Sequence, residues 1–162
     1  MAIPDFVVAL REKIGTAPLW LSGVTAVVVK EDQLLLVRRA DDGAWTPVTG
    51  IIDPGEHPAD AAVREVAEEA GVRVVPERLA QVGVTERVVY PNGDESQYLD
   101  LTFLMRWADG EPYPADGENT HVAWFAMDAL PSMSPEMNAR IEAALSDRPS
   151  AAFRFAGEPL EG

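Results

Sequence analysis

The sequence contains no cysteine, which excludes disulfides, a thiol nucleophile and a zinc site built on cysteine. It has two histidines, His57 and His121, whose spacing is not that of metal ligands, so we expect both to be structural or surface residues. No apolar run approaches the roughly 18–20 residues that a membrane-spanning helix needs. The N-terminus is amphipathic and lacks the pattern of a signal peptide. These absences favour a cytoplasmic protein with no membrane partner.

Positive charge is also scarce. The chain has 13 lysines and arginines against 27 aspartates and glutamates, which gives a formal net charge of −14. A protein that binds a nucleic acid polymer needs a basic surface, so we expect no such partner. Small phosphate-bearing substrates stay open, because bound divalent cations reverse the local field.

A length of 162 residues and a hydrophobic content of 47% are typical of one globular domain with its own core. We therefore expect a single domain over residues 1–162. Residues 1–15 are predicted to form an amphipathic helix, whose apolar face would be covered by its own domain or by a partner subunit. The tail, residues 148–162, carries Phe153 and Phe155 and is expected to dock either on the domain or on a second subunit.

Runs of β-branched and alternating apolar residues predict strands on both sides of the middle of the chain. The expected strands pair as two hairpins, 23–30 with 33–39 and 79–90 with 97–107. Arg38 and Arg39 fall on opposite faces of a regular strand. One of them is therefore a candidate contact for a phosphate or a diphosphate-linked group.

The stretch from 50 to 72, GIIDPGEHPADAAVREVAEEAGV, carries the strongest chemical signal. Pro58 suits the first turn of a helix, and Gly71 suits a left-handed cap at its end. On that helix the apolar side chains form one stripe, which consists of Ala59, Ala62, Val63, Val66 and Ala70. The acidic side chains fall on roughly the opposite side, at Glu65, Glu68 and Glu69.

Three carboxylates on one helical patch repel one another, at a cost on the order of a few tenths of a kcal/mol for each close pair. They form either a solvated acidic face or a site for a cation. Carboxylate oxygens suit Mg²⁺ or Mn²⁺ rather than zinc. The preceding loop favours the cation, because Gly50 permits close approach of the backbone to a ligand and Arg64 is placed to hold a glutamate through two bonds.

The same stretch resembles the Nudix box, G-x5-E-x7-R-E-U-x-E-E-x-G-U with U an apolar residue, at every defined position from Gly50 to Val72. The resemblance implies an α+β fold, the Nudix α/β/α sandwich, in which a mixed β-sheet is flanked by helices; the N-terminal amphipathic helix is an addition to it. It also implies a Mg²⁺-dependent hydrolase, with Mn²⁺ as a substitute. The reaction would be attack of water at phosphorus in a nucleoside diphosphate linked to another moiety X. A homodimer is expected from the family, from the apolar N-terminal helix and from the tail.

The resemblance also suggests roles for individual residues. The expected metal shell consists of the Gly50 carbonyl, Glu56, Glu65, Glu68 and Glu69. Arg64 would orient Glu65. Glu56 would act either as a ligand through water or by pairing with Arg64.

The general base is expected to be one of these glutamates or a carboxylate from a later loop. Glu118 is the first loop candidate and Asp116 the second. Weaker candidates for substrate binding are Arg38, Arg39 and Trp45. For Trp45, packing under the loop is the competing interpretation.

The identity of X, and with it the substrate, stays open. The substrate is either ADP-ribose or another nucleotide sugar, or an oxidised nucleoside triphosphate. Pro47-Val48-Thr49-Gly50 stands where many relatives carry a P-G-G run, and this reduces the backbone freedom before Gly50. Isopentenyl-diphosphate isomerases share the fold but use a catalytic cysteine, which this chain lacks. The alternative function is a non-catalytic nucleotide-binding or sensor domain. Such domains usually lose box carboxylates, and this chain keeps all of them.

Overall fold

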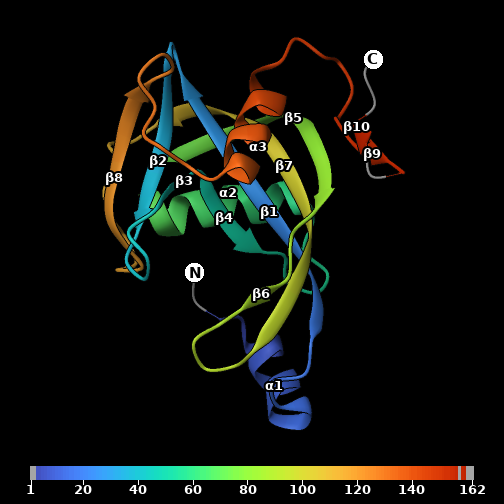
Figure 1. Ribbon diagram of the computed structural model, residues 1–162. Helices are drawn as coiled ribbons and strands as arrows, with labels where there is room; N and C mark the ends of the chain where they lie inside the picture. The colour runs from blue at the N-terminus through green and yellow to red at the C-terminus, as the bar shows by residue number, and fades with distance from the viewer. Residues whose placement is uncertain (1–2, 157, 160–162) are drawn as a thin grey trace.

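The computed structural model describes residues 3–156 and 158–159. In this part of the chain the helices are α1 (Asp5–Ile14), α2 (Pro58–Ala70) and α3 (Pro135–Leu145). The strands are β1 (Leu19–Lys30), β2 (Gln33–Arg39), β3 (Trp45–Thr46), β4 (Val48–Ile51), β5 (Arg73–Val84), β6 (Val88–Val89), β7 (Glu95–Asp109), β8 (Asn119–Ala126), β9 (Arg154–Phe155) and β10 (Glu158–Pro159). Figure 1 shows the large sheet between α2 and α3, with α1 at one end of the molecule.

The large sheet is mixed and has the strand order β3–β2–β1–β7–β5, with β4 on β1, β6 on β7 and β8 on β2. Strands β1 and β7 run parallel, from Leu19 opposite Ser96 to Val29 opposite Arg106. Both predicted hairpins are present as antiparallel pairs, β1 with β2 and β5 with β7. In the second pair the outer strand begins at Arg73 rather than 79, because it continues almost directly from the end of α2.

Alternation of side chains along the strands divides the core into two layers, since successive residues point to opposite faces. The face toward α2 buries residues of β1 and β2 against Ala62 and Val66 of the helix. The strand residues include Val24, Ala26, Val28, Leu35 and Val37. The face toward α3 buries Val27, Leu34, Leu36, Ile141 and Ala144. The apolar runs in β1 and β2 are thus covered on both sides, as expected for central strands. The predicted α/β/α sandwich is confirmed.

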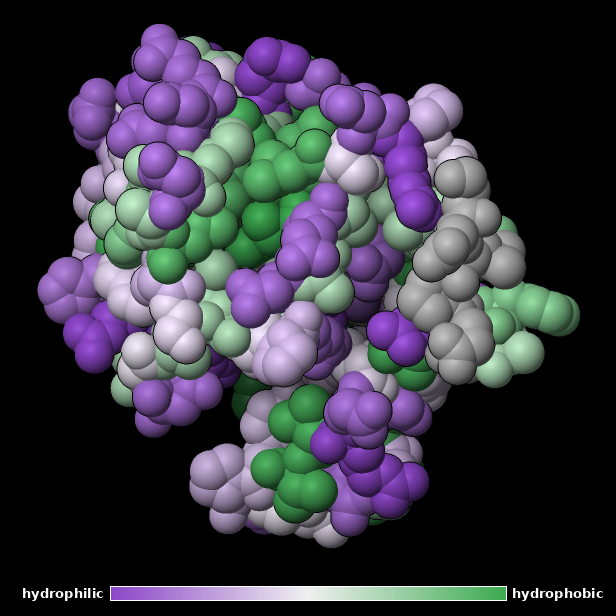
Figure 2. All heavy atoms as spheres, turned by 45° about the horizontal axis from the view of Figure 1, so that its top comes forward, coloured by the Kyte–Doolittle hydropathy of each residue, from purple (hydrophilic) through white to green (hydrophobic). Residues whose placement is uncertain are grey.

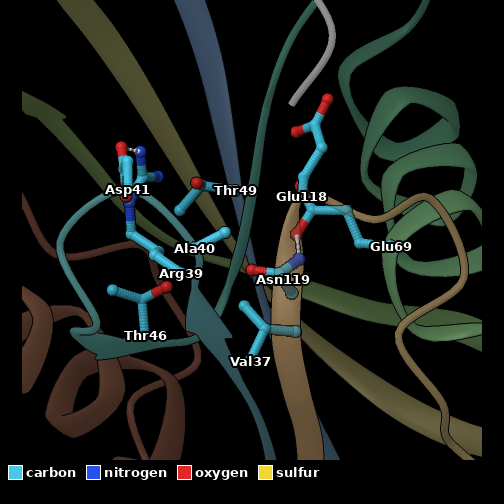
Figure 3. A pocket seen from close by; sticks show the side chains of 9 residues that line it. All are labelled: Val37, Arg39, Ala40, Asp41, Thr46, Thr49, Glu69, Glu118 and Asn119. Atoms are coloured by element: carbon cyan, nitrogen blue, oxygen red, sulfur yellow. Dashed lines mark hydrogen bonds and ion pairs between the residues drawn. The ribbon is translucent and has the colours of Figure 1, made fainter.

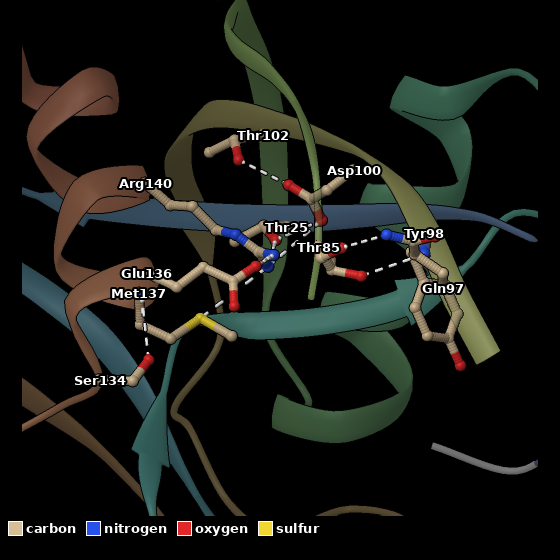
Figure 4. Close-up of polar contacts among 10 residues, drawn as sticks. All are labelled: Thr25, Thr85, Gln97, Tyr98, Asp100, Thr102, Ser134, Glu136, Met137 and Arg140. Atoms are coloured by element: carbon tan, nitrogen blue, oxygen red, sulfur yellow. Dashed lines mark hydrogen bonds and ion pairs between the residues drawn. The ribbon is translucent and has the colours of Figure 1, made fainter. Parts of the chain in front are cut away.

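Helix α3 is joined to the sheet by a buried polar group of side chains, which we call the Arg140 cluster: Thr25, Asp100, Thr102 and Arg140. Nη1 of Arg140 donates to the Thr25 hydroxyl over 2.8 Å and lies 3.3 Å from Oδ1 of Asp100. The hydroxyls of Thr25 and Thr102 each donate to Asp100 over 2.8 Å. Figure 4 shows how Arg140 reaches from the helix to residues of β1 and β7. All four side chains are buried, so the cluster ties three elements together.

The predicted N-terminal helix is confirmed as α1, and it ends at Gly15 with a φ of 60°. Val7 packs with Leu21 and Ile51 at one end of the sheet. Several other apolar side chains of this segment stay exposed, namely Ile3, Val8, Leu10 and Ile14. The domain therefore covers only part of the apolar face of the helix.

The tail contacts its own domain through the backbone. The N–H of Ala152 donates to the carbonyl of Ala80 over 2.8 Å, and its carbonyl accepts from the N–H of Val82 over 2.9 Å. This pairing covers part of the edge of β5, while Phe153 and Phe155 remain exposed. The parts of the predicted tail, domain and N-terminal helix that fall on residues 1–2, 157 and 160–162 lie outside the described residues.

On the face seen in Figure 2, hydrophilic residues border a hollow in which hydrophobic residues gather. Among the described residues, no helix combines the length and the apolar character needed to cross a membrane.

Candidate active site

Helix α2 begins and ends where the sequence predicts. Pro58 occupies its first turn, and Gly71 follows its last residue with a left-handed φ of 68°. Glu65 and Glu69 are only 5% and 4% exposed, so a solvated acidic face is the wrong interpretation for these two residues. Strand β4 and the loop that follows β7 cover this side of the helix.

Arg64 lies at the centre of the box side chains. Its Nε and Nη2 donate to the two carboxylate oxygens of Glu56, each over 2.9 Å. Its Nη1 donates to Oε1 of Glu65 over 2.9 Å and to Oε2 of Glu68 over 3.2 Å. Nη2 also donates to the carbonyl of Ile51 over 3.1 Å. One guanidinium thus joins the loop, the helix and the end of β4, and the expected two-bond contact is made with Glu56.

The loop before α2 is closed by the same carboxylate. The N–H of Asp53 donates to Oε2 of Glu56 over 3.1 Å, and the N–H of Glu56 donates to the Asp53 carbonyl over 3.0 Å. The hydrogen bonds from Arg64 hold the pKa of Glu56 below its ordinary value. Glu56 is therefore a carboxylate anion at neutral pH, and its pairing with Arg64 is the geometry that the structure shows.

Gly50 is the point where Glu65 meets the backbone of β4. A Cβ atom at Gly50 would stand 2.1 Å from the carboxyl carbon of Glu65. Only glycine leaves room for this contact. Glycine is therefore required at position 50 for steric reasons and not for its backbone conformation. Burial raises the pKa of Glu65, while the charge of Arg64 acts in the opposite direction.

Glu69 is held by a residue that the sequence analysis missed. Nδ2 of Asn119, the first residue of β8, donates to Oε2 of Glu69 over 3.0 Å, and both side chains are buried. Burial raises the pKa of Glu69 to about 7, although the hydrogen bond from Asn119 opposes this shift. The sequence offers one hint, which is that Asn119 directly follows Glu118.

A cavity of about 250 Å³ lies beside Glu69. Its lining comes from strands β2, β3, β4 and β8, from helix α2, and from the loops after β2 and before β8. It consists of Val37, Arg39, Ala40, Asp41, Thr46, Thr49, Glu69, Glu118 and Asn119. In Figure 3, Arg39 and Asp41 lie across the cavity from the two glutamates and Asn119. The side chains of Arg39 and Asp41 are joined by two hydrogen bonds. The fold thus brings two predicted residues, Arg39 and Glu118, to the same cavity as Glu69.

Two other predicted substrate contacts lie away from this cavity. Trp45 packs edge-on against Phe125 with ring centroids 4.9 Å apart, in the core layer on the α3 side. Arg38, its register neighbour on β2, donates from Nε to the Gly43 carbonyl over 3.1 Å. Alternation along β2 turns the side chain of Arg38 away from this cavity, and Trp45 does not line it either, so a contact of either residue with substrate stays a prediction.

The remaining candidates, Asp116 and the two histidines, do not line this cavity. Asp116 is exposed and accepts a 3.0 Å hydrogen bond from the N–H of Glu118, so it shapes the loop. His57 precedes α2 without making a side-chain cap, and His121 is exposed beside Trp45.

The donor atoms around Arg64 decide whether the site fits a divalent cation. Within residues 3–156 and 158–159, no three His, Cys, Asp or Glu side chains already stand together as a metal-binding group. Arg64 and Asn119 instead engage one oxygen each of Glu65, Glu68 and Glu69. Every carboxylate has a second oxygen to offer, and hard oxygen donors are those that Mg²⁺ and Mn²⁺ prefer. The residues therefore fit such an ion in their chemistry, and binding would draw the three side chains together.

The class follows from an α/β/α sandwich in which an arginine holds the glutamates of one helix and one of these glutamates lies against a glycine of the adjacent strand. This is the arrangement of a Nudix domain. The family model for the NUDIX domain matches residues 20–147. The chain belongs to the Nudix family, and the resemblance of residues 50–72 to the Nudix box is confirmed.

Several known proteins resemble this chain. A Bacillus subtilis (strain 168) protein, YjhB, provisionally named an ADP-ribose pyrophosphatase, is 32% identical over 71% of this chain and 54% of its own length. NudC of Pseudomonas aeruginosa (strain LESB58), named an NAD-capped RNA hydrolase, is 32% identical over 66% of this chain and 36% of its own. The chain thus spans only about half and about a third of these relatives. The crystal structure of an ADP-ribose pyrophosphatase from Streptococcus suis 89-1591 superposes with a TM-score of 0.64 and 26% identity, over 83% of this chain and 98% of that one.

Proposed function

We propose that this protein is a Mg²⁺-dependent hydrolase that cleaves the diphosphate bond of a nucleoside diphosphate linked to a second moiety. The observation that carries the proposal is the position of Arg64, which gathers Glu56, Glu65 and Glu68 beside the Gly50 strand. Arg64 leaves one oxygen each of Glu65 and Glu68 without a bond from its guanidinium, and such oxygens suit a divalent cation.

The chain's own residues have separate tasks in this proposal. Glu65, Glu68 and Glu69, with the Gly50 carbonyl, would hold the ion, and Glu56 would act through Arg64. When bound, a divalent cation shields the negative charge of a diphosphate and makes a bound water more acidic. Arg64 orients Glu65 and Glu68, and the buried Asn119 orients Glu69. Each of these contacts limits the side-chain freedom that binding would otherwise have to remove.

A general base is required to take a proton from the attacking water. Glu118 and Glu69 both line the cavity where a substrate diphosphate would lie next to the box helix. A carboxylate of this cavity would take the proton of the attacking water, and both Glu118 and Glu69 are candidates. Replacing each one by glutamine and comparing the pH dependence of turnover would separate them.

For the second moiety we propose a sugar, as in ADP-ribose, with a nucleoside triphosphate as the alternative. Thr46, Thr49 and Asn119 give the cavity hydroxyl and amide groups, which match the hydroxyls of a sugar. The names of YjhB and of the Streptococcus suis enzyme agree with this choice. Capped RNA, named for NudC, is disfavoured by the net charge of −14.

The test is a substrate panel with purified protein and Mg²⁺, in which released monophosphate is measured for ADP-ribose, nucleoside triphosphates and NAD-capped RNA. Chelation by EDTA should abolish turnover and Mg²⁺ should restore it. Glu68→Gln should lower turnover at least about a hundredfold while the protein stays folded. Glu142→Gln, an exposed glutamate on α3, is the matched control and should keep normal turnover.

Turnover that persists in excess EDTA would rule out the divalent mechanism. Nucleotide binding without turnover of any substrate would favour the alternative, a non-catalytic nucleotide-binding or sensor domain. A homodimer also remains a proposal. Its support is the exposed apolar surface of α1, and light scattering of the purified chain tests it.

A further inference from the structure

The loop between β7 and β8, residues 110–118, completes the end of helix α2. The last carbonyls of a helix have no partner within the helix. Here the carbonyl of Ala70 accepts from the N–H of Tyr113 over 3.1 Å, and that of Glu69 accepts from the N–H of Ala115 over 3.2 Å. The loop therefore supplies two donors to the very turn that carries Glu69.

The side chain of Tyr113 lies directly on Gly71. A Cβ atom at Gly71 would stand 2.3 Å from Cε1 of the tyrosine ring and 2.7 Å from Cδ1. Gly71 therefore meets two demands at once, since its φ of 68° also favours glycine. Tyr113 is itself 56% exposed, so the ring rests on the backbone of the helix end and is not part of the core.

The start of the loop is held at the same place. Nε1 of Trp107 donates to the Gly110 carbonyl over 3.0 Å, and a Cβ atom at Gly110 would stand 3.2 Å from the Gly71 carbonyl oxygen. The end of the loop is held at β2, where the carbonyl of Glu118 accepts from the N–H of Ala40 over 3.0 Å. Tyr113 thus lies between two attachments, and the residues that follow it lead to Glu118 and Asn119.

We propose that Tyr113 is a positioning residue for the metal site: by resting on Gly71 it fixes the 110–118 loop, and the backbone bonds of that loop hold the last turn of α2 so that Glu69 stays against Asn119. Tyr113 does not touch the cavity, so it acts through the backbone bonds of its loop to the end of α2, the turn that carries Glu69. The inference rests on the proposed function, because it assigns the effect of the loop to the binding of Mg²⁺ by Glu69.

The test compares Tyr113→Ala with Tyr113→Phe, which keeps the ring, and with Phe153→Ala, which removes an exposed ring of the tail. The first readout is amide hydrogen exchange of the metal-free protein. In Tyr113→Ala the amides of residues 113 and 115 should exchange faster than in the wild type, while those of β1 and β7 are unchanged. In the two other variants the loop should exchange at the wild-type rate.

The second readout is the Mg²⁺ concentration that half-saturates the thermal shift of the protein without substrate. Tyr113→Ala should raise it about tenfold, as expected when a group that orients a metal ligand is removed. Tyr113→Phe and Phe153→Ala should leave it unchanged. Unchanged exchange in the loop of Tyr113→Ala, or unchanged Mg²⁺ dependence beside faster exchange, would overturn the proposal. Absence of any Mg²⁺ shift in the wild type would instead count against the metal site, and the exchange measurement would still decide whether Tyr113 fixes the loop.

Discussion

Asn119 and Glu69 stand 50 residues apart in the chain and meet through a 3.0 Å hydrogen bond in which the amide donates to the carboxylate. The bond favours the charged form of Glu69, while burial disfavours it. Burial has the larger effect, and the pKa of Glu69 rises to about 7. An ionised Glu69 therefore lowers the stability of the metal-free protein, as is common for groups that are kept for function.

We expect Glu69→Gln to stabilise the metal-free protein at alkaline pH. The folded state binds the proton of Glu69 more tightly than the unfolded state, so the contribution of Glu69 to stability is lost as pH rises from its ordinary pKa of 4.5 through about 7. Glutamine still accepts a hydrogen bond from Asn119 but does not titrate. Melting temperatures in EDTA at about pH 5 and about pH 8.5 measure the effect, and the variant should gain on the wild type at the higher pH.

Glu142→Gln provides the control, because this exposed residue of α3 should show no such pH-dependent difference. If Glu69→Gln differed from the wild type by the same amount at both pH values, the raised pKa would be disproved. With Mg²⁺ present the order should reverse, because the ion stabilises only the protein that keeps the carboxylate.

Replacement of Arg64 by lysine should show that the several N–H donors of the guanidinium, and not only its charge, hold the site together. Lysine cannot bond both oxygens of Glu56 and reach Glu65 at once. We expect a loss of about 1–3 kcal/mol in the free energy of unfolding, measured by urea denaturation without metal. Arg87→Lys, at an exposed contact with Glu95, should change it by less than about 0.5 kcal/mol. Equal losses in the two variants would contradict the central position of Arg64.

Gly50→Ala should displace Glu65 and weaken metal binding. The added methyl group would stand 2.1 Å from the carboxyl carbon of Glu65, so the side chain has to move away from β4. We expect the thermal shift produced by Mg²⁺ to disappear, although the variant still folds. Gly83→Ala on β5 is the control, because the added methyl group would meet only the end of the flexible Gln81 side chain, at 3.2 Å. A normal Mg²⁺ shift in Gly50→Ala would show that Glu65 is not a ligand.

Arg140→Ala should strongly destabilise the fold without touching the cavity. The change would leave Asp100 buried with two hydroxyl donors but no cation (Figure 4), and burial already raises the pKa of Asp100. We expect a loss of about 3–5 kcal/mol, measured by urea denaturation at neutral pH. Glu136→Gln removes only the negative charge of the half-exposed partner of the same arginine. It should lower the free energy of unfolding by no more than about 1 kcal/mol. A small effect of Arg140→Ala would mean that packing, not the ion pair, joins α3 to the sheet.

Local rules determined much of this protein from its sequence. Pro58 and Gly71 mark the ends of α2, because their backbone preferences act on adjacent residues alone. The contact of Arg64 with Glu68 follows from their i, i+4 spacing on one helix. Glu56 stands just before the first turn of α2 and Arg64 lies on that helix, so their pairing is also close in sequence, and the box pattern identified the family.

Tertiary structure decided what surrounds those residues. The burial of Glu65 and Glu69, the presence of Asn119 beside Glu69, and the separation of Arg39 from Trp45 depend on which strands become neighbours. Strand β8 pairs with β2 from some eighty residues away, with Arg39 opposite Asn119. The alternation of apolar and polar residues along each strand is compatible with several partner strands. The pairing of β8 with β2 is therefore selected by the burial of both faces of the whole sheet. The sequence alone therefore specified the carboxylates on the helix, and the packing of the whole sheet specified their chemical environment.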